Sequence, residues 1–315
     1  MSGRTFAIID PAAGISGDML LGALIAAGAP EQWLARLPSR LGIPDVSVAI
    51  ESVDRCGIRC RKVTVRMPDG AVEGPRAAHG HPGGHGHHGP HRHVGQLIGM
   101  VERAPLSEWV RQRAVRAFQL LGEAEGRVHG VPPESVALHE VGALDALVDI
   151  VGGIEGFEQL GLSDIHVRPV ALGEGWVHAA HGMLPVPAPA TALLMEGLHV
   201  GPNGPVQGEA TTPTGAALLQ VLTSGASPVH WRPLRSGWGA GTRNPGGYPN
   251  ALRLMVAERS AEAGDVSQLA ADLDDLSPEY LAPLREALIG GSRHAENREK
   301  NENGGADSGS PVLFQ

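Results

Sequence analysis

The sequence predicts an α/β or α+β fold, with a mixed sheet packed against helices, a flexible histidine-rich loop inserted and a disordered C-terminal tail. Short apolar runs alternate with longer stretches of helical periodicity. Two strand-like runs, at residues 46–53 and 61–67, follow one another without a helix between them, which argues against a purely parallel sheet. Hydrophobic residues make up 42% of the 315 residues and aromatic residues only 3%, so Ala, Leu and Val must build the core.

The first elements have clear start and stop signals. Ser16 is a suitable N-cap for the first helix, and Gly28 and Pro30 end it. The adjacent strands are expected to pair antiparallel through a turn at 54–59. In order, we predict a buried strand at 5–9, helices at 17–27 and 31–41, and strands at 46–53 and 61–67.

The rest of the chain continues this alternation. Pro105 ahead of Ser107 marks a new helix start. We predict helices at 94–103, 106–128, 132–140, 143–160, within 185–198, at 213–222 and from 277 to 290, and strands at 164–172, 251–257 and 268–273.

A histidine-rich segment, AHGHPGGHGHHGPHRH, occupies residues 78–93. Gly and Pro fill most of the space between its histidines and cannot form a packed core, whereas imidazoles can surround a borderline-soft cation. We therefore expect a flexible metal-binding loop. Its seven imidazoles belong to His79, His81, His85, His87, His88, His91 and His93.

Charge and composition exclude several classes of protein. The net charge of −9 argues against a nucleic-acid-binding protein and favours one that attracts cations. Neither a signal peptide nor a membrane-spanning run is evident, so we expect a cytoplasmic protein. The two cysteines, Cys56 and Cys60, form no disulfide framework. They are a metal-binding thiolate pair or, as we favour, two small residues on an extended segment.

Two constellations carry carboxylates. Asp10-Pro-Ala-Ala-Gly-Ile-Ser16-Gly-Asp18 runs from a strand end to a helix start, and its carboxylates suit a cation or a cation-bridged phosphate, or simply cap the helix. His139 and Glu140 precede a helix on which Asp145 and Asp149 are four residues apart and share a face. This second group suits an octahedral metal or general-base chemistry, or only the helix dipole.

Three further features suggest a ligand-binding wall. His178 and His181 are three residues apart in a glycine- and proline-rich stretch, and such a pair is more often structural than ligating. Glu209, Thr211, Thr212 and Thr214 cluster at a helix start that suits a phosphate, or form an ordinary threonine cap. Arg243 follows a flexible Gly-Ala-Gly stretch and could hold a phosphate bidentately, or be an exposed arginine without such a role.

Together these segments resemble the LarC family, the nickel-insertion proteins of nickel-pincer cofactor biosynthesis. The resemblance covers about residues 5–290. It rests, in order, on DPAAGISGDMLLGAL, the histidine-rich insertion, LHEVGALDALVDIVG, AHGMLPVPAPAT, GEATTPTGAALL, and GAGTR followed by PNALRL.

The resemblance implies an enzyme, a nickel chelatase of the lyase class. It would insert Ni²⁺ into pyridinium-3,5-bisthiocarboxylic acid mononucleotide, an anionic sulfur-containing substrate, to give the cofactor of lactate racemase-type enzymes. The family reaction depends on CTP with Mn²⁺ or Mg²⁺, and CTP binding belongs to the family's C-terminal domain. The implied partners are the racemase-type acceptor enzyme and that C-terminal part, and we expect a homo-oligomer.

The same resemblance also suggests the domain organisation. We assign 1–258 to the nickel-insertion domain with its metal loop at 78–93, and 259–290 to a linker and the start of a truncated C-terminal domain. Residues 291–315 read as a disordered tail, an out-of-frame extension or added residues. Since some family members join two reading frames by ribosomal frameshifting, we hypothesise that this chain is the unshifted N-terminal product.

We assign roles to the individual residues as follows. Glu140 is our choice for the base that removes the ring proton before the nickel–carbon bond forms. The catalytic set is His139, Glu140 and Asp145. The metal set comprises the seven loop histidines with His181, Asp10 and Asp18. The substrate set is Ser16, Glu209, Thr211, Thr212, Thr214 and Arg243.

Two alternatives belong to other functional classes. A nickel storage or delivery protein without chemistry would need only the histidine loop. A metal-dependent hydrolase would use the carboxylates and turn over substrate without transferring nickel.

Overall fold

A computed structural model describes residues 5–67, 92–138, 143–179, 182–225 and 227–259. The chain divides into two compact units, one of Arg4–Glu258 and the other of Met1–Gly3 with Arg259–Gln315. The description below concerns the first unit. Most of the predicted histidine loop, the strand at 268–273, the helix from 277 and the tail lie outside the described residues.

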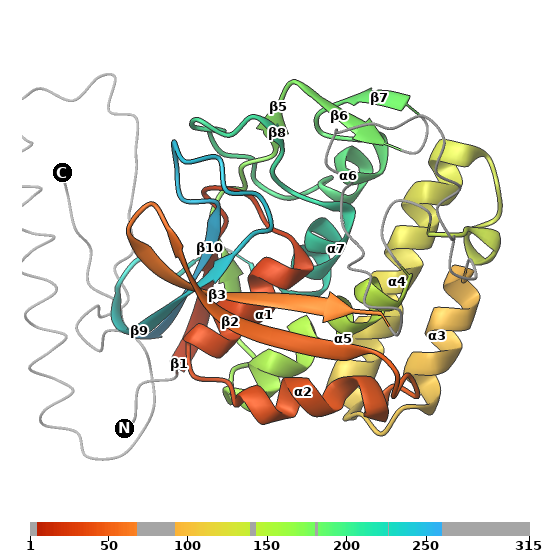
Figure 1. Cartoon of the computed structure of the whole chain (residues 1–315), viewed down its shortest axis with the longest axis horizontal. Coiled ribbons are helices and arrows are strands. Elements are labelled where there is room, and N and C mark those ends of the chain that lie inside the picture. The colour runs from red at the N-terminus through yellow and green to blue at the C-terminus, as the bar shows by residue number, and fades with distance from the viewer. Residues whose placement is uncertain (1–4, 68–91, 139–142, 180–181, 226, 260–315) are drawn as a thin grey trace, which may run out of the picture. The chain divides into compact units, whose positions relative to one another are not determined.

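A mixed six-stranded sheet in the order β2-β3-β9-β10-β1-β4 forms the framework (Figure 1). β1 pairs antiparallel with β10 and parallel with β4, and β2 pairs antiparallel with β3. β3 and β9 are parallel neighbours. The predicted mixed sheet is therefore confirmed. The strands are β1 (Thr5–Asp10), β2 (Ser47–Arg55), β3 (Ile58–Arg66), β4 (Ile165–Val167), β9 (Trp231–Ala240) and β10 (Ala251–Arg259).

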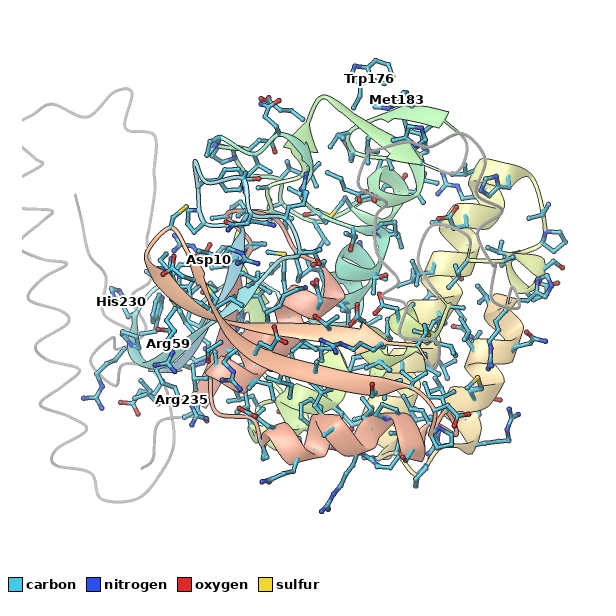
Figure 2. All side chains as sticks on the ribbon, in the orientation of Figure 1. Asp10, Arg59, Trp176, Met183, His230 and Arg235 are labelled. Atoms are coloured by element: carbon cyan, nitrogen blue, oxygen red, sulfur yellow. The ribbon has the colours of Figure 1, made fainter. Side chains whose placement is uncertain are left out.

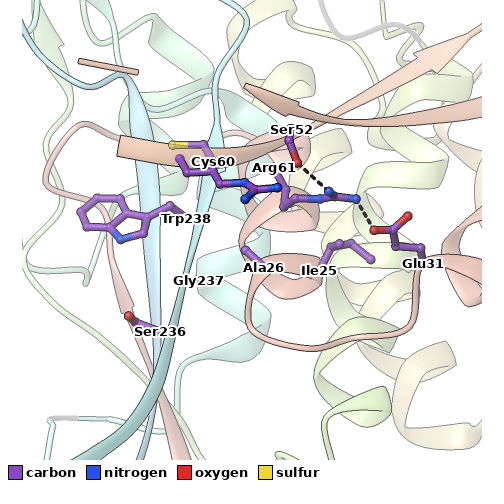
Figure 3. Close-up of a pocket in the computed structure, with 10 residues that line it drawn as sticks. Ile25, Ala26, Glu31, Ser52, Cys60, Arg61, Ser236, Gly237 and Trp238 are labelled. Atoms are coloured by element: carbon purple, nitrogen blue, oxygen red, sulfur yellow. Dashed lines mark hydrogen bonds and ion pairs between the residues drawn. The ribbon is translucent and has the colours of Figure 1, made fainter. Parts of the chain in front are cut away.

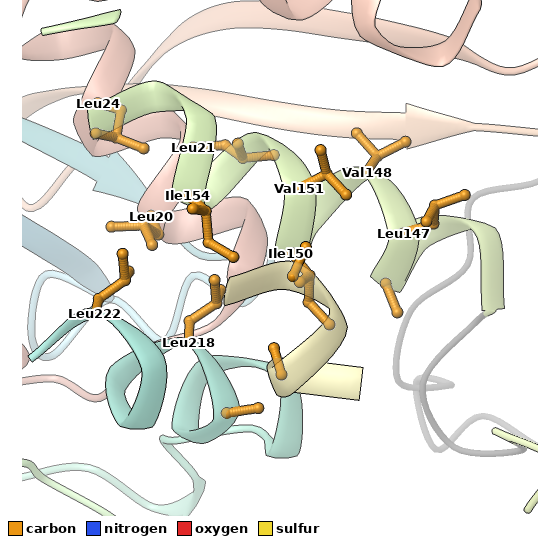
Figure 4. Close-up of a cluster of buried hydrophobic side chains, with 14 of the residues drawn as sticks. Leu20, Leu21, Leu24, Leu147, Val148, Ile150, Val151, Ile154, Leu218 and Leu222 are labelled. Atoms are coloured by element: carbon orange, nitrogen blue, oxygen red, sulfur yellow. The ribbon is translucent and has the colours of Figure 1, made fainter. Parts of the chain in front are cut away.

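The helices pack on this sheet and on one another through aliphatic side chains. α1 contacts β3 and β9 on one side and α5 on the other, and α5 also contacts α4 and α7 (Figure 4). The buried leucines, isoleucines and valines of these helices form one continuous core, as the low aromatic content required. The helices are α1 (Gly17–Ala26), α2 (Glu31–Arg40), α3 (Val94–Arg103), α4 (Glu108–His129), α5 (Ala143–Gln159), α6 (Pro189–Leu194) and α7 (Pro213–Leu222).

Glycines allow α1 to approach the sheet closely. A Cβ on Gly239 of β9 would lie 1.8 Å from the Met19 carbonyl oxygen, and one on Gly237 would lie 2.4 Å from the Ala23 carbonyl oxygen. Gly22 of α1 faces β3 in the same way, 2.3 Å from the Arg61 carbonyl oxygen. Backbone therefore packs on backbone, and this contact fixes where the two ends of α1 lie.

Small elements complete the unit. β5 (Gly173–Glu174) pairs with β8 (Gly208–Glu209), and β6 (Trp176–Ala179) pairs with β7 (Gly182–Pro185) in a separate hairpin. A 3₁₀ turn, η1 (Pro133–Ser135), follows α4. In the described part of the chain, no helix combines the length and the apolar character that crossing a membrane requires.

Several predicted elements need correction. The predicted helix at 132–140 is only η1, because Pro132 and Pro133 adjoin and prevent regular helix hydrogen bonding. The predicted strand at 164–172 keeps only Ile165–Val167, with Pro169 just beyond it. The helix within 185–198 is confined to Pro189–Leu194.

The turn between β2 and β3 is tighter than predicted. Cys56 and Gly57 form it, with φ of 52° and 81°, the left-handed pair that a two-residue hairpin turn requires. Cys56 is exposed, whereas Cys60 of β3 is buried beside Ala240 of β9 and Ala251 of β10. Burial raises the pKa of the Cys60 thiol. The two cysteines are free thiols at a turn and on an extended strand.

Candidate functional site

The loop between β1 and α1 interlocks with the loop before α7. Gly14 has a φ of 84°, and a Cβ there would lie 2.1 Å from the Ala210 carbonyl oxygen. The Thr212 N–H donates to the Ile15 carbonyl at 3.0 Å, and Gly215 packs against the same carbonyl. Two segments about 200 residues apart in sequence thus form one structure at the amino-terminal end of α1.

Asp18, in the first turn of α1, is the centre of this region. Its carboxylate accepts hydrogen bonds from the Ser16 hydroxyl and from the Met19 N–H, the latter at 2.8 Å. Lys62 of β3 makes a close ion pair with it. The Asp18 side chain is 21% exposed and the Lys62 side chain 12%, so this pair is largely shielded from water.

Thr242, which precedes the predicted Arg243, joins the same network. Lys62 donates to the Thr242 hydroxyl oxygen at 2.9 Å, and that hydroxyl lies 3.3 Å from the Asp18 carboxylate. Sequence reasoning missed both Lys62 and Thr242. The Gly-Ala-Gly-Thr-Arg stretch contained a signal for Thr242, but Lys62 lies in an ordinary strand pattern, so only the strand arrangement identifies it.

Asp149 of α5 lies under this network. Its carboxyl group occupies the space that a Gly17 side chain would need, with Oδ2 2.2 Å from the position of a Cβ. Burial raises the pKa of Asp149 well above its ordinary value, and the nearby Asp145 and Asp18 raise it further. Lys62 and the Asp18 backbone N–H oppose this shift in part. Asp149 Oδ1 is buried and has no hydrogen-bond partner among the described residues.

The predicted phosphate-binding group is largely engaged in holding the backbone. The Thr211 hydroxyl is fully buried and donates to the Ala171 carbonyl at 2.7 Å. Thr212 is the N-cap of α7 and accepts from the Gly215 N–H at 3.2 Å. The Thr214 hydroxyl is buried and lacks a partner within the described ranges.

Arg243 crosslinks the same loop from the other side. Its guanidinium donates to the Gln207 carbonyl at 3.0 Å and, more closely, to the Glu209 carbonyl. Glu209 itself lies in β8, paired with Gly173 of β5. The segments GEATTPTG and GAGTR are therefore joined directly, and Arg243 positions the loop that carries Glu209.

Asp10 and Asp18, both predicted to bind metal, belong to separate ion pairs. Asp10 at the carboxyl end of β1 is buried and pairs closely with Arg253 of β10 (Figure 2). The Arg253 guanidinium also lies over the Trp238 ring, 5.4 Å from its centre.

The remaining predicted residues fall into two groups. His93 is the N-cap residue of α3, and its Nδ1 is 2.8 Å from the Ser135 carbonyl, so it attaches α3 to η1. Outside the described residues lie His139, Glu140, His181, His79, His81, His85, His87, His88 and His91. Across the described ranges, no group of three or more His, Cys, Asp or Glu side chains has the arrangement of a metal site.

The described site thus combines one shielded ammonium group and a carboxylate, at two adjoining helix starts, with a buried carboxyl group of raised pKa on α5. Asp145 and Asp149 stand on the face of α5 that meets α1, close to the segment that contains His139 and Glu140 in sequence. Such a site can hold an anionic group at Lys62 in exchange for Asp18, its partner in the structure, and can retain or accept a proton at the carboxylates.

Comparisons with known proteins identify the family of this chain. A putative nickel insertion protein of Thermomicrobium roseum is 42% identical over 290 residues, which are 90% of this chain and 66% of that protein. Two proteins named pyridinium-3,5-bisthiocarboxylic acid mononucleotide nickel insertion protein, from Nocardioides sp. and Akkermansia muciniphila, are each 39% identical, over 90% of this chain and 68% of theirs.

The chain spans about two thirds of the length of these curated relatives. No solved structure matches it significantly. The family model described as nickel insertion protein matches residues 7–292, which include every site segment described above. The chain therefore belongs to the nickel insertion protein family.

Proposed function

We propose that this chain inserts nickel into pyridinium-3,5-bisthiocarboxylic acid mononucleotide, producing the nickel-pincer cofactor of lactate racemase-type enzymes in the cytoplasm. Family membership supports nickel insertion, and the names of the Nocardioides and Akkermansia relatives support the substrate. Because this chain spans only about two thirds of the length of the relatives, we assign the CTP-dependent step with Mn²⁺ or Mg²⁺ to their additional part.

The observation that carries the proposal is the meeting of four separate sequence segments at the amino-terminal end of α1. Asp18, Lys62 and Asp149 come from α1, β3 and α5, and Thr242 from the loop after β9, yet they lie in one hydrogen-bonded or electrostatically coupled group. We propose that the substrate phosphate replaces Asp18 as the partner of Lys62. Thr211 and Arg243 instead hold backbone carbonyls of the loops that form the site.

Nickel, as the cargo, needs a ligand set from which it can leave. Imidazole nitrogens bind Ni²⁺ without out-competing thiolate-type sulfurs, so the histidine segment at 78–93 would gather the ion. His139 and His181, with a carboxylate, would then present it to the substrate. Formation of the nickel–carbon bond releases a ring proton, for which Glu140 remains the proposed base, and Asp145 remains in the proposed catalytic set.

The test is an anaerobic incubation of the chain with Ni²⁺, the mononucleotide, CTP and Mg²⁺, with and without the C-terminal part of the Nocardioides relative. Mass spectrometry of the nickel-bound product gives the readout. We expect product from the complemented chain, and none from His139→Ala or Glu140→Ala at any nickel concentration. A chain without residues 78–93 should bind fewer nickel ions yet form product when nickel is abundant.

Nickel storage or delivery is the second candidate, favoured by the seven histidines of residues 78–93. It predicts stoichiometric nickel binding and no product in either arm of the same experiment. Normal insertion by both the His139→Ala and Glu140→Ala variants would instead show that the catalytic residues lie elsewhere.

A further inference from the structure

A pocket of about 380 Å³ opens at the other end of α1 (Figure 3). It lies between Ile25 and Ala26 of α1, the start of α2, and the strands β2, β3 and β9. Ala26 is eight residues beyond Asp18, so about 12 Å of helix separates this pocket from the site described above. None of the family segments used to define that site lines the pocket, and Ile25 and Ala26 directly follow the first of these segments.

Strand register places three arginines on one face beside this pocket. β3 and β9 run parallel, with Arg61 opposite Gly239. Because side chains alternate along a strand, Arg59 and Arg61 share a face with Gly239, Gly237 and Arg235. This is the face on which the glycines contact the α1 backbone.

Among the described residues, only one of these three guanidinium groups has a counter-charge. Arg61 pairs closely with Glu31 and donates to the Ser52 hydroxyl at 2.8 Å. Arg59 and Arg235 are exposed, and neither makes an ion pair or hydrogen bond with a described residue.

The two uncompensated arginines flank the same opening. Arg59 lines the pocket itself. Arg235 lies at its edge, with Nη1 3.3 Å from the position of a Cβ on Gly28, two residues beyond Ala26. Figure 2 shows both side chains at the same margin of the described unit. In a chain of net charge −9, this concentration of positive charge favours a bound anion.

We propose that this pocket is a second binding site, separate from the site at the start of α1, for a phosphate ester of nucleotide size. Guanidinium groups match phosphate oxygens with paired hydrogen bonds. The Ser52 oxygen accepts from Arg61, so its own hydroxyl proton is free to donate to an anion. The volume is within the range of small-molecule sites. The proposal is independent of nickel insertion.

Calorimetric titration of the full chain with inorganic phosphate, cytidine monophosphate and nicotinate mononucleotide tests it. We expect saturable binding, tighter for both nucleotides than for phosphate, and the tighter of the two identifies the preferred base. Arg59→Ala combined with Arg235→Ala should weaken nucleotide binding about tenfold or more. Arg232→Ala is the matched control, since Arg232 is on the same strand but the opposite face and pairs with Glu258.

A gain of affinity gives a test that misfolding cannot imitate. Glu31→Gln removes the carboxylate that neutralises Arg61, so nucleotide binding should tighten, by about threefold. The proposal is overturned if the unmodified chain shows no saturable nucleotide binding, if the double variant binds as tightly as the unmodified chain, or if phosphate binds as tightly as the nucleotides.

Discussion

The two ends of α1 differ in how their charged groups are satisfied. At the amino-terminal end, Asp18 accepts from Ser16 and Lys62 and sits over a buried acid, Asp149. At the carboxyl-terminal end, Arg59 and Arg235 have no counter-charge in the described part of the chain. The first end was visible in the sequence as dense motifs, and the second was not. Sequence motifs identified the residues that build the first site. The pairing register of β3 and β9 was needed to show which arginines can bind a ligand at the second.

The largest effect should come from a substitution that forces the whole of α1, and with it both of its ends, away from the sheet. Gly239→Ala places a Cβ 1.8 Å from the Met19 carbonyl oxygen, in a contact of backbone with backbone that no side-chain rotation relieves. We expect the free energy of unfolding to fall by about 3 kcal/mol. Urea unfolding measures it.

Gly247→Ala is the control for that substitution. No atom lies within 4 Å of the position of a Cβ at Gly247, and its φ is not in the left-handed region. We expect a change below about 1 kcal/mol. Equal losses in both variants would show that the close approach of α1 to β9 does not hold the unit together.

The next largest effect concerns the shielded ion pair. Lys62→Met leaves the Asp18 carboxylate next to Asp149 and Asp145 without its cation, which should cost about 2 kcal/mol after allowance for partial exposure. Asp18→Asn added to this variant removes the unpaired charge and should recover part of the loss. A double-mutant cycle by urea unfolding gives the coupling, and additive effects would contradict the pairing.

Asp149 provides a test that depends on pH. Its pKa is raised in the folded protein, so between the ordinary and the raised value the folded chain holds a proton that the unfolded chain has released. The stabilising contribution is complete below the ordinary pKa of an aspartate and disappears as pH rises through the raised value. Asp149→Asn cannot ionise, so its stability relative to the unmodified chain should increase as pH rises.

Urea unfolding of both proteins over a pH series measures this difference. A constant difference in the free energy of unfolding across the series would mean that the Asp149 carboxyl is ionised alike in the folded and unfolded chains. A decreasing difference would mean that Lys62 and the Asp18 N–H outweigh burial.

Much of the fold was predictable because its elements carry strong local signals. The first strand and α1 are apolar runs bounded by clear stop signals, and α4 and α7 begin at the N-cap residues Ser107 and Thr212. Each of these elements, and α2, was predicted to within a few residues. β9 was missed, because Trp231–Ala240 contains a proline, two glycines and two arginines and has no alternating pattern. Its strand character comes from pairing with β3 and β10 and from the contact of its glycines with α1, none of which a local pattern contains.

The site was predictable only as a set of segments. Asp18 and Asp149 stood out because carboxylates at a helix start and four residues apart on a helix are recognisable patterns. Their partners could not be predicted, because Lys62 meets Asp18 only through the packing of the β2–β3 hairpin against α1, which no local sequence pattern contains. Likewise, the sequence offered Arg243 as a phosphate ligand, and only the fold shows it bonded to two carbonyls.

The smallest expected effect on stability completes the comparison of the two ends. Arg59→Ala with Arg235→Ala removes two exposed groups that have no described partner, so the free energy of unfolding should change by less than about 0.5 kcal/mol. A small gain would agree with relief of repulsion between the guanidinium groups. A loss near that of Lys62→Met would show that these arginines support the fold, and the weaker nucleotide binding of the double variant would then have a structural cause. Unchanged stability with weakened binding would instead show that the two ends of α1 have different roles. The charges at the amino-terminal end would then stabilise the fold by pairing, and those at the carboxyl-terminal end would bind a ligand.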